Sequence, residues 1–362
     1  MRVVHVFWSL TYGGIETMLV NIANAQAESG AEVHVCIIKD IYKEELIKSF
    51  RGDVTLHFLN RKSNSKGIGF ILKVNKLLMQ LQPDAIHLHS SRLYTFLWRK
   101  RLSRVASVTL HDLPTGSVRR GSLVSRLFPF LFGAGNVYYI DRAPRVFAIS
   151  DAVKDELWKN HGVKSTVVCN GIMTRKFKLR PEHTAGNPFR IVMVSRLEHD
   201  KKGQDLLIEA VAKLHGLVHV DLIGEGSSRE YLENLVKHLH AESIVSFLGV
   251  KPQTYIAEHL ADYDLFVQPS RWEGFGLTVA EAMAAKVPVL VSAGQGPAEV
   301  TCGNLYGWTF ENGNADDLAA KIKYIYDNYK EAMEKANTAL SYVQDTYDVS
   351  VTARKYLELY GK

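Results

Sequence analysis

Short apolar runs rich in β-branched residues alternate with amphipathic segments along the first half of the chain. The runs are Val3 to Phe7, Val33 to Ile38, Val54 to Phe58, Ala85 to His89, Val105 to Leu110, Val146 to Ile149 and Thr166 to Val168. Strands that alternate with helices form parallel sheets joined by right-handed crossovers. The pattern therefore predicts an α/β domain with a doubly wound parallel sheet over residues 1–172.

The alternation stops at a polar segment and then restarts. Residues 173–188 contain basic side chains, Gly186 and two prolines and follow neither a helical nor a strand period, which indicates an interdomain linker. The later runs are Arg190 to Val194, Val218 to Ile223, Ile244 to Leu248, Leu265 to Gln268, Val287 to Val291 and Gly307 to Phe310. We predict a second doubly wound domain over residues 189–345 and a final helix over residues 346–362.

Length and composition agree with two domains. The chain has 362 residues, of which 46% are hydrophobic, and a single core rarely grows beyond about 250 to 300 residues. The three cysteines, Cys36, Cys169 and Cys302, are far apart and suggest neither a disulfide framework nor a metal site, so we expect a cytoplasmic protein. Val3 to Phe7 is too short for a signal peptide, and the longest apolar stretch, Leu127 to Ile140, is too short to span a bilayer.

Positive charge is concentrated in one stretch. Residues 92–126 hold eight basic residues against the single acid Asp112, a net charge of +7 that leaves −1 for the rest of a chain with a total of +6. The basic residues and the neighbouring aromatic residues are Arg92, Arg99, Lys100, Arg101, Arg104, Arg119, Arg120 and Arg126, with Trp98, Phe128, Phe130 and Phe132. Such a patch suits an anionic membrane surface, and an ordinary solvated basic helix is the alternative. No recognition motif for nucleic acid accompanies it.

The most specific motif follows the strand that ends at Gln268. Residues 269–284 read PSRWEGFGLTVAEAMA, with a loop containing Gly274 and Gly276 before a helix that begins near Leu277. This order directs backbone N–H groups and the positive end of the helix dipole at a phosphate-sized anion. Seven residues separate Glu273 in the loop from Glu281 in the helix.

This stretch resembles the E-x7-E signature of glycosyltransferase family 4, a retaining branch of the enzymes with the GT-B fold. The resemblance implies two Rossmann-like doubly wound parallel-sheet domains that face a central cleft, with residues 1–172 binding the acceptor and residues 189–345 binding a nucleotide sugar. It also implies that Glu273 borders the donor sugar and that Glu281 holds the ribose hydroxyls, because a carboxylate accepts two hydrogen bonds at once. We expect the helix over residues 346–362 to cross back to the first domain.

A second set of residues resembles the family's diphosphate contacts. Arg196 ends a strand, and Lys202 precedes Gly203 as the family's lysine does, although the gap from Arg196 is one residue longer than usual and Lys201 stays possible. Two fixed cations could neutralise a departing diphosphate without a metal or other cofactor. The donor-binding residues implied by the resemblance are Gly13, Gly14, Arg196, Lys202, Val250, Glu273, Gly274, Phe275, Gly276, Leu277, Thr278 and Glu281.

A histidine in the first domain completes the expected catalytic centre. Residues 108–112, VTLHD, resemble the family's T-x-H-D at the end of the fifth strand, whose histidine lies at the donor sugar. We assign His111 to the catalytic centre, with Arg196, Lys202 and Glu273. His87, on the preceding strand, is interpreted as a packed or orienting histidine.

Two other patterns favour structural roles. Residues 224–229, GEGSSR, follow a strand as a dinucleotide fingerprint would, but the third glycine is Arg229. Asp262 and Asp264 resemble a metal-chelating D-x-D, yet they lie at a helix end that enters a strand, which favours capping and packing.

The resemblance predicts retention of the anomeric configuration. No carboxylate is placed by motif as a nucleophile on the far sugar face, so a same-face reaction fits better than double displacement. A UDP-sugar is the first expected donor and a GDP-sugar the next. The expected acceptor is a glycan or polyprenyl-linked molecule in the synthesis of bacterial surface polysaccharide. We expect the enzyme to reach it from the inner face of the cytoplasmic membrane. The alternatives are a nucleotide-sugar epimerase of the same architecture, a phosphorylase and an inactive binding subunit.

Overall fold

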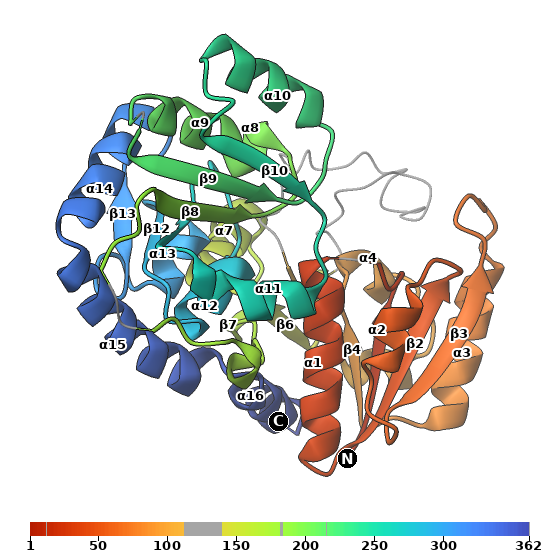
Figure 1. Ribbon diagram of the computed structural model, residues 1–362. Coiled ribbons are helices and arrows are strands. Elements are labelled where there is room, and N and C mark those ends of the chain that lie inside the picture. The colour runs from red at the N-terminus through yellow and green to blue at the C-terminus, as the bar shows by residue number, and fades with distance from the viewer. Residues whose placement is uncertain (12, 112–139, 182–183, 215, 362) are drawn as a thin grey trace. The chain divides into compact units, whose positions relative to one another are not determined.

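The computed structural model describes residues 1–11, 13–111, 140–181, 184–214 and 216–361, which form two compact units (Figure 1). Met1–Gly171 with Val349–Lys362 make the first unit, and Ile172–Asp348 make the second. The segment 173–188, predicted as a linker from its polar composition, therefore belongs to the second unit. It includes a short 3-10 turn, Thr174–Lys176, and the buried residue Arg180.

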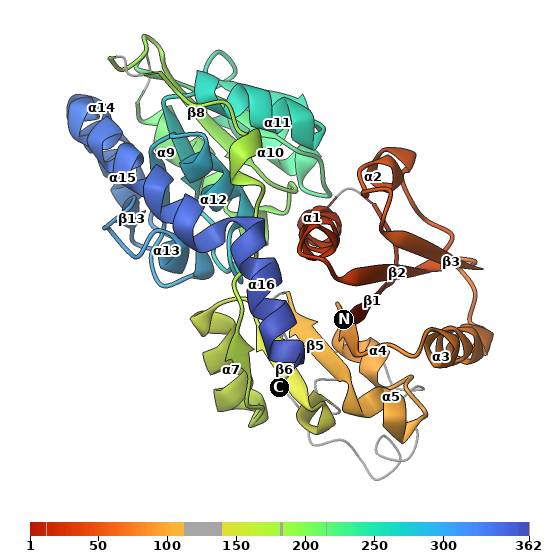
Figure 2. The ribbon, with the colours of Figure 1, turned by 90° about the horizontal axis from the view of Figure 1, so that it is seen from below.

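The first unit is built on a parallel sheet that has, within the described residues, seven strands in the order β3-β2-β1-β4-β5-β6-β7. The strands are β1 (Arg2–Phe7), β2 (Glu32–Lys39), β3 (Thr55–Arg61), β4 (Ala85–Leu88), β5 (Ala106–Leu110), β6 (Arg145–Ala148) and β7 (Thr166–Val167). The helices are α1 (Gly14–Glu28), α2 (Glu44–Lys48), α3 (Gly69–Leu81), α4 (Ser91–Tyr94), α5 (Lys100–Arg104), α7 (Asp151–His161) and α16 (Val349–Tyr360). Figure 2 shows α1 and α2 on one face of β1 to β3 and α3 on the other.

The second unit repeats this plan with the described strand order β10-β9-β8-β11-β12-β13, again all parallel. The strands are β8 (Phe189–Val194), β9 (Val218–Ile223), β10 (Val245–Gly249), β11 (Leu265–Gln268), β12 (Val289–Ser292) and β13 (Trp308–Phe310). The helices are α8 (His199–Lys202), α9 (Gln204–Ala212), α10 (Arg229–His238), α11 (Gln253–His259), α12 (Leu277–Ala284), α13 (Gly296–Val300), α14 (Ala315–Asp327) and α15 (Tyr329–Tyr347).

These sheets confirm the predicted fold class. The central strands are apolar along nearly their whole length because helices leave neither face of a parallel sheet to water; β11, for example, is buried at every position. The strand order reverses between β1 and β4 in the first unit and between β8 and β11 in the second. In open α/β sheets, ligands bind beyond the carboxyl ends of the strands at such a switch point.

The last helix, α16, belongs to the first unit. It packs against α1 (Figure 2). Its residues Tyr356 and Tyr360 are buried. Gly171 lies close against the start of α16, because a Cβ at that position would lie 2.7 Å from the Val349 backbone and 2.6 Å from the Thr352 hydroxyl. No helix among the described residues is both long and apolar enough to cross a bilayer.

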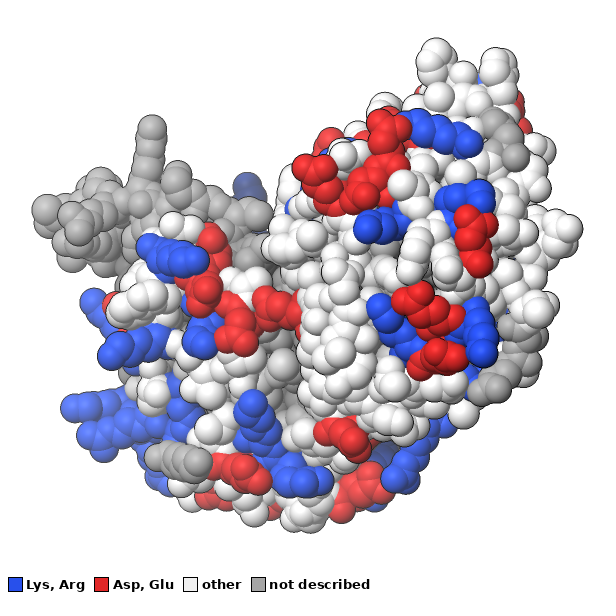
Figure 3. Space-filling model, turned by 90° about the vertical axis from the view of Figure 1, so that its left-hand side faces the viewer, with Lys and Arg blue, Asp and Glu red and all other residues white. Residues whose placement is uncertain are grey.

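The predicted basic stretch is only partly described. Arg92, Arg99, Lys100, Arg101 and Arg104 lie on or beside α4 and α5, whereas Arg119, Arg120, Arg126, Phe128, Phe130 and Phe132 lie outside the described residues. On the face drawn in Figure 3, Lys and Arg side chains are interspersed with Asp and Glu over much of the surface.

Candidate active site

The signature loop, residues 269–276, connects β11 to α12 at the switch point of the second unit. Gly276 caps α12 with a φ of 102°, a backbone conformation that other residues rarely adopt. The next connection packs directly on the loop: a Cβ at Gly296 would lie 2.5 Å from the Gly274 backbone. The Gly296 amide donates to the Glu273 carbonyl at 3.0 Å, and the Gln295 side-chain oxygen accepts from the Glu273 amide at 3.2 Å. The backbone around Glu273 is thus fixed from the α13 side.

A second set of contacts fixes the same loop to the turn between α8 and α9. Gly203, with a φ of 72°, approaches Pro269 so closely that a Cβ would lie 2.0 Å from its carbonyl oxygen. The Arg271 guanidinium donates to both carboxylate oxygens of Asp205 at 2.9 and 2.7 Å. Such bidentate pairs add geometric specificity to binding energy. The loop and the α8–α9 turn therefore form one preorganised structure.

Lys202 and Glu273 form an ion pair at this junction. Their side chains are only 13% and 18% exposed, so the pair is better shielded from water than an ordinary surface pair. Lys201, the alternative in the sequence, contributes its backbone carbonyl as acceptor for the Arg271 amide at 2.9 Å. Of the two lysines, the structure places Lys202 beside the signature glutamate.

Arg196 follows β8 and is much more open. Its side chain is 69% exposed and pairs with Glu198 at 3.1 Å, a surface contact worth about 1 kcal/mol or less. Its guanidinium can therefore turn toward a ligand at little cost. Behind it, Gly224 lies so close that a Cβ would be 1.9 Å from the Ser195 carbonyl oxygen. This packing explains the GEGSSR glycines without a dinucleotide.

Glu281 is a buried carboxyl group of the second unit. It lies in the second turn of α12, is 8% exposed and accepts a hydrogen bond from the Gln253 amide at 2.8 Å. Burial raises its pKa to about 7, against the opposing effect of Gln253, because a low dielectric disfavours the charged carboxylate. Gln253 was not found from the sequence, since it lies on α11 and no local motif marks it.

The side chains of the remaining predicted donor-binding residues differ in how far they are exposed to solvent. Phe275 is buried and packs edge-on against Tyr347 at 5.4 Å between ring centroids, so its side chain anchors the loop. Leu277 and Thr278 are partly exposed, and Thr278 donates to the Gln268 side chain at 3.3 Å. Val250 is exposed just after β10.

In the first unit, Gly13 and Gly14 are exposed at the start of α1. A Cβ at Gly13 would lie 2.5 Å from the Glu16 carboxylate, which also accepts from the Thr11 hydroxyl at 3.0 Å. His111 follows β5, also in the first unit, and is partly buried. It is the end of a row of imidazoles that the sequence shows only in part, because His5 comes from another strand.

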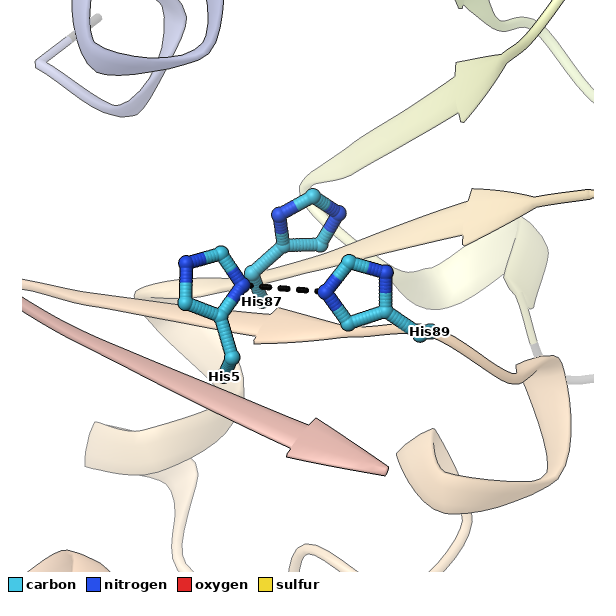
Figure 4. Close-up of side chains that lie close together, drawn as sticks. All are labelled: His5, His87 and His89. Atoms are coloured by element: carbon cyan, nitrogen blue, oxygen red, sulfur yellow. Dashed lines mark hydrogen bonds between the residues drawn. The ribbon is translucent and has the colours of Figure 1, made fainter. Parts of the chain in front are cut away.

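Three buried histidines lie close together here, His5, His87 and His89, of which His5 and His89 belong to this row (Figure 4). Ring nitrogens of His5 and His89 lie 2.9 Å apart, as the dashed line marks, and His89 is 3.1 Å from His111. Burial lowers the pKa of His5 to about 4 and takes those of His87 and His89 well below the usual value. These imidazoles are therefore neutral at pH 7.

His87 takes part in a second hydrogen-bonded row. Its Nε2 lies 2.6 Å from the Thr109 hydroxyl and its Nδ1 is 2.5 Å from the Tyr360 hydroxyl, so it is packed and oriented from both sides. Among the described residues, His5, His87 and His89 are the group whose ligand atoms lie close enough for a metal ion, within 4.8 Å. Each of their six ring nitrogens is already within hydrogen-bond distance of a protein atom.

The D-x-D pattern is structural in the described part of the second unit. Asp264 is buried in an ion pair with Arg180 and accepts from the Arg190 amide at 2.7 Å. Asp262 pairs with His259 at 2.8 Å. Asp264 is therefore a packed residue, as predicted, and Arg180 is one of the residues that tie the polar segment 173–188 to the second unit.

Comparison with known proteins places the chain in a family. A model described as Glycosyltransferase Family 4 matches residues 12–176, and one described as Glycosyl transferases group 1 matches residues 175–340. The amylovoran biosynthesis glycosyltransferase AmsK of Erwinia amylovora is 28% identical over 60% of this chain and 57% of its own length, little more than half of that relative. The poly(ribitol-phosphate) alpha-N-acetylglucosaminyltransferase of Staphylococcus aureus is 27% identical over 64% of this chain and 47% of its own.

Solved structures share the fold. Anabaena Alr3699/HepE, in complex with UDP and glucose, has a TM-score of 0.81 and 22% identity, and the match covers 100% of this chain and 99% of that one. TarM of S. aureus, in complex with UDP and other ligands, has a TM-score of 0.79 and 15% identity with full coverage of both chains. With these matches, the E-x7-E loop and the paired parallel sheets, the chain belongs to the family 4, group 1 glycosyltransferases of the GT-B fold.

Proposed function

We propose that this glycosyltransferase moves a sugar from a nucleotide diphosphate sugar to a glycan or lipid-linked acceptor with retention of the anomeric configuration. The observation that carries the proposal is the signature loop at the switch point of the second unit, with Glu273 paired to Lys202 and Glu281 buried behind it. A UDP-sugar is the first candidate donor, because the structural relative HepE is described in complex with UDP-glucose. A GDP-sugar is the next.

The nucleotide is bound by the second unit. The Glu281 carboxylate accepts hydrogen bonds from the ribose hydroxyls, while Val250 marks the loop for the base. The N-terminus of α12 and the cations of Arg196 and Lys202 receive the diphosphate. Support comes from the open position of Arg196 and from the rigid attachment of Lys202 to the loop.

The reaction proceeds on one face of the sugar. The bond between the anomeric carbon and the diphosphate oxygen breaks as the acceptor oxygen forms its bond on the same side. The acceptor proton passes to the departing diphosphate, whose growing negative charge Arg196 and Lys202 stabilise. Glu273 and His111 orient the sugar. Because Arg196 and Lys202 supply positive charge to the diphosphate, we expect that no metal is needed and that activity survives EDTA.

A thermal-shift panel of UDP-, GDP- and ADP-sugars tests the donor. A ligand that binds only the folded state raises the melting temperature by mass action, so one nucleotide should give a clearly larger shift than the others. Equal shifts, or none, would argue against the proposed site. Donor turnover without any acceptor would instead favour an epimerase.

The acceptor is proposed to be reached at an anionic membrane surface. Support comes from the net charge of +7 over residues 92–126 and from relatives named for amylovoran and colanic acid biosynthesis. Each basic residue near such a surface is worth about 1 kcal/mol. The protein should therefore pellet with anionic vesicles at low salt and be released at high salt. Equal pelleting with neutral vesicles, or none with either, would indicate a soluble acceptor.

A further inference from the structure

We propose that Gln26 is a positioning residue that, through His5 and His89, holds His111 as the tautomer with its hydrogen on Nε2. The geometry of the row stands on its own. Only the consequence for the donor sugar rests on the proposed function of His111.

The row links four side chains: one on a helix, one on a strand and two just beyond the ends of neighbouring strands. Gln26, on α1, lies with its Oε1 2.8 Å from the Nε2 of His5 on β1. The Nδ1 of His5 lies 2.9 Å from the Nε2 of His89, just after β4. The Nδ1 of His89 lies 3.1 Å from the Nε2 of His111, just after β5. The row therefore begins at a fully buried amide and ends at the predicted catalytic histidine.

A neutral imidazole has one N–H donor and one bare acceptor nitrogen. His5 and His89 are buried and neutral at pH 7, so every hydrogen bond along the row must point in the same direction. Since Gln26 offers its oxygen, His5 donates from Nε2 and accepts at Nδ1 from His89. His89 in turn accepts at Nδ1 from His111. The hydrogen of His111 is consequently on Nε2, and its Nδ1 is the acceptor.

The orientation of the Gln26 amide decides the direction of the whole row. In the structure its Oε1 faces the Nε2 of His5 at 2.8 Å. If the amide were reversed, each imidazole in the row would flip its hydrogen and His111 would present a donor instead of an acceptor.

The predicted acceptor at Nδ1 matters for the proposed reaction. The tautomer decides whether this nitrogen, which is buried in the structure, accepts or donates a hydrogen bond. Holding the tautomer in advance is the role that a buried orienting group has for a catalytic histidine in other enzymes. A zinc ion at His5, His87 and His89 would be incompatible with the row, because it would displace these hydrogen bonds.

Nitrogen NMR of the full chain labelled with 15N-histidine tests the proposal, since protonated and bare ring nitrogens resonate far apart. His111 is assigned from the signal lost in His111→Gln. In the wild-type protein we expect a protonated Nε2 and a bare Nδ1 at His111. A protonated Nδ1 at His111 in the wild-type protein would overturn the proposal. Zinc binding would also overturn it, if the addition of zinc alone abolished the hydrogen-bonded signals of His5 and His89.

The matched variants are Gln26→Met and Thr109→Val. Both remove a buried hydrogen-bonding group of the same core, but Thr109 lies only in the His87 row. Gln26→Met should abolish the single tautomer of His111 and leave a mixture, whereas Thr109→Val should retain it. An unchanged His111 signal in folded Gln26→Met would show that Gln26 is merely structural.

Activity separates this proposal from the proposed function. With the donor identified, Gln26→Met should lower kcat roughly tenfold or more with little change in KM, because only part of the protein then carries the productive tautomer. If the tautomer changes as expected and kcat does not, Gln26 still positions His111, and it is the role of His111 at the sugar that fails.

Discussion

Replacing Glu281 by glutamine should stabilise the protein while weakening donor binding. The carboxyl group is buried on α12, and its pKa is raised from its usual 4.5 to about 7. Below pH 4.5 the group is protonated in the folded and unfolded states, so burial carries no charge penalty. Between pH 4.5 and 7 the unfolded chain releases a proton that the folded protein keeps, and stability falls as pH rises. Above pH 7 the full penalty is present.

The raised pKa sets the size of the effect. A shift of this kind, at 1.36 kcal/mol per pKa unit, corresponds to about 3 kcal/mol of lost stability at pH 8. Glutamine has nearly the same shape, has no charge to desolvate, and its oxygen can still accept from Gln253. Glu281→Gln should therefore be nearly neutral at pH 4.5 and stabilising by up to about 3 kcal/mol at pH 8. Functional groups often carry such a stability cost.

Urea unfolding of both proteins at pH 5 and pH 8 measures this difference, with Trp272 and Trp308 of the second unit as fluorescent reporters. Glu258→Gln is the matched control, because it removes an exposed carboxylate on the neighbouring helix α11. A midpoint gain that is equal at the two pH values, or that Glu258→Gln reproduces, would refute the reasoning.

Three further results are expected. Lys202→Met should lower kcat by roughly 10²–10³-fold, as loss of a transition-state cation does, whereas Lys201→Met should change it little; similar steady-state rates for both variants would remove Lys202 from the site. Gly203→Ala should cost at least about 1 kcal/mol in urea unfolding, because its φ is 72° and its Cβ would meet a carbonyl oxygen; wild-type stability would contradict that. Burial lowers the pKa of His5 in the folded protein to about 4, so the stability of the first unit should fall by about 3 kcal/mol as pH drops from 7 toward 4. Amide hydrogen exchange in β1 measures this loss, and unchanged protection over that pH range would contradict it.

The sequence predicted the strands well because each buried parallel strand is a short apolar run between turns. The segment 173–188, whose polar composition predicted an interdomain linker, is grouped with the second unit. Within it, Arg180 is buried and pairs with Asp264, which lies 84 residues away in the chain. A local pattern cannot show such a partner.

The candidate site also has residues that the sequence could identify and residues that it could not. Glu273 and Glu281 could be named from a compact motif that resembles a family, and Lys202 from a second set of residues that resembles it. Gln253, which contacts Glu281, and Gln26, which starts the histidine row, could not, because their partners come from other elements and only the fold brings them together. Of that row, His111 is the member that a sequence motif marked.

The central claim, that Glu281 holds the nucleotide of a sugar donor, is tested most directly by calorimetric titration. UDP-, GDP- and ADP-sugars should be titrated into the wild-type protein, Glu281→Ala and the control Glu258→Ala at pH 6.5, in buffers of different ionisation enthalpy. At least one donor should bind the wild-type and control proteins with release of a proton, because the ribose contact requires the ionised carboxylate. Glu281→Ala should bind the same donor at least tenfold more weakly and release no proton. Equal affinity and equal proton release in Glu281→Ala, or no binding of any donor to the wild-type protein, would contradict the account.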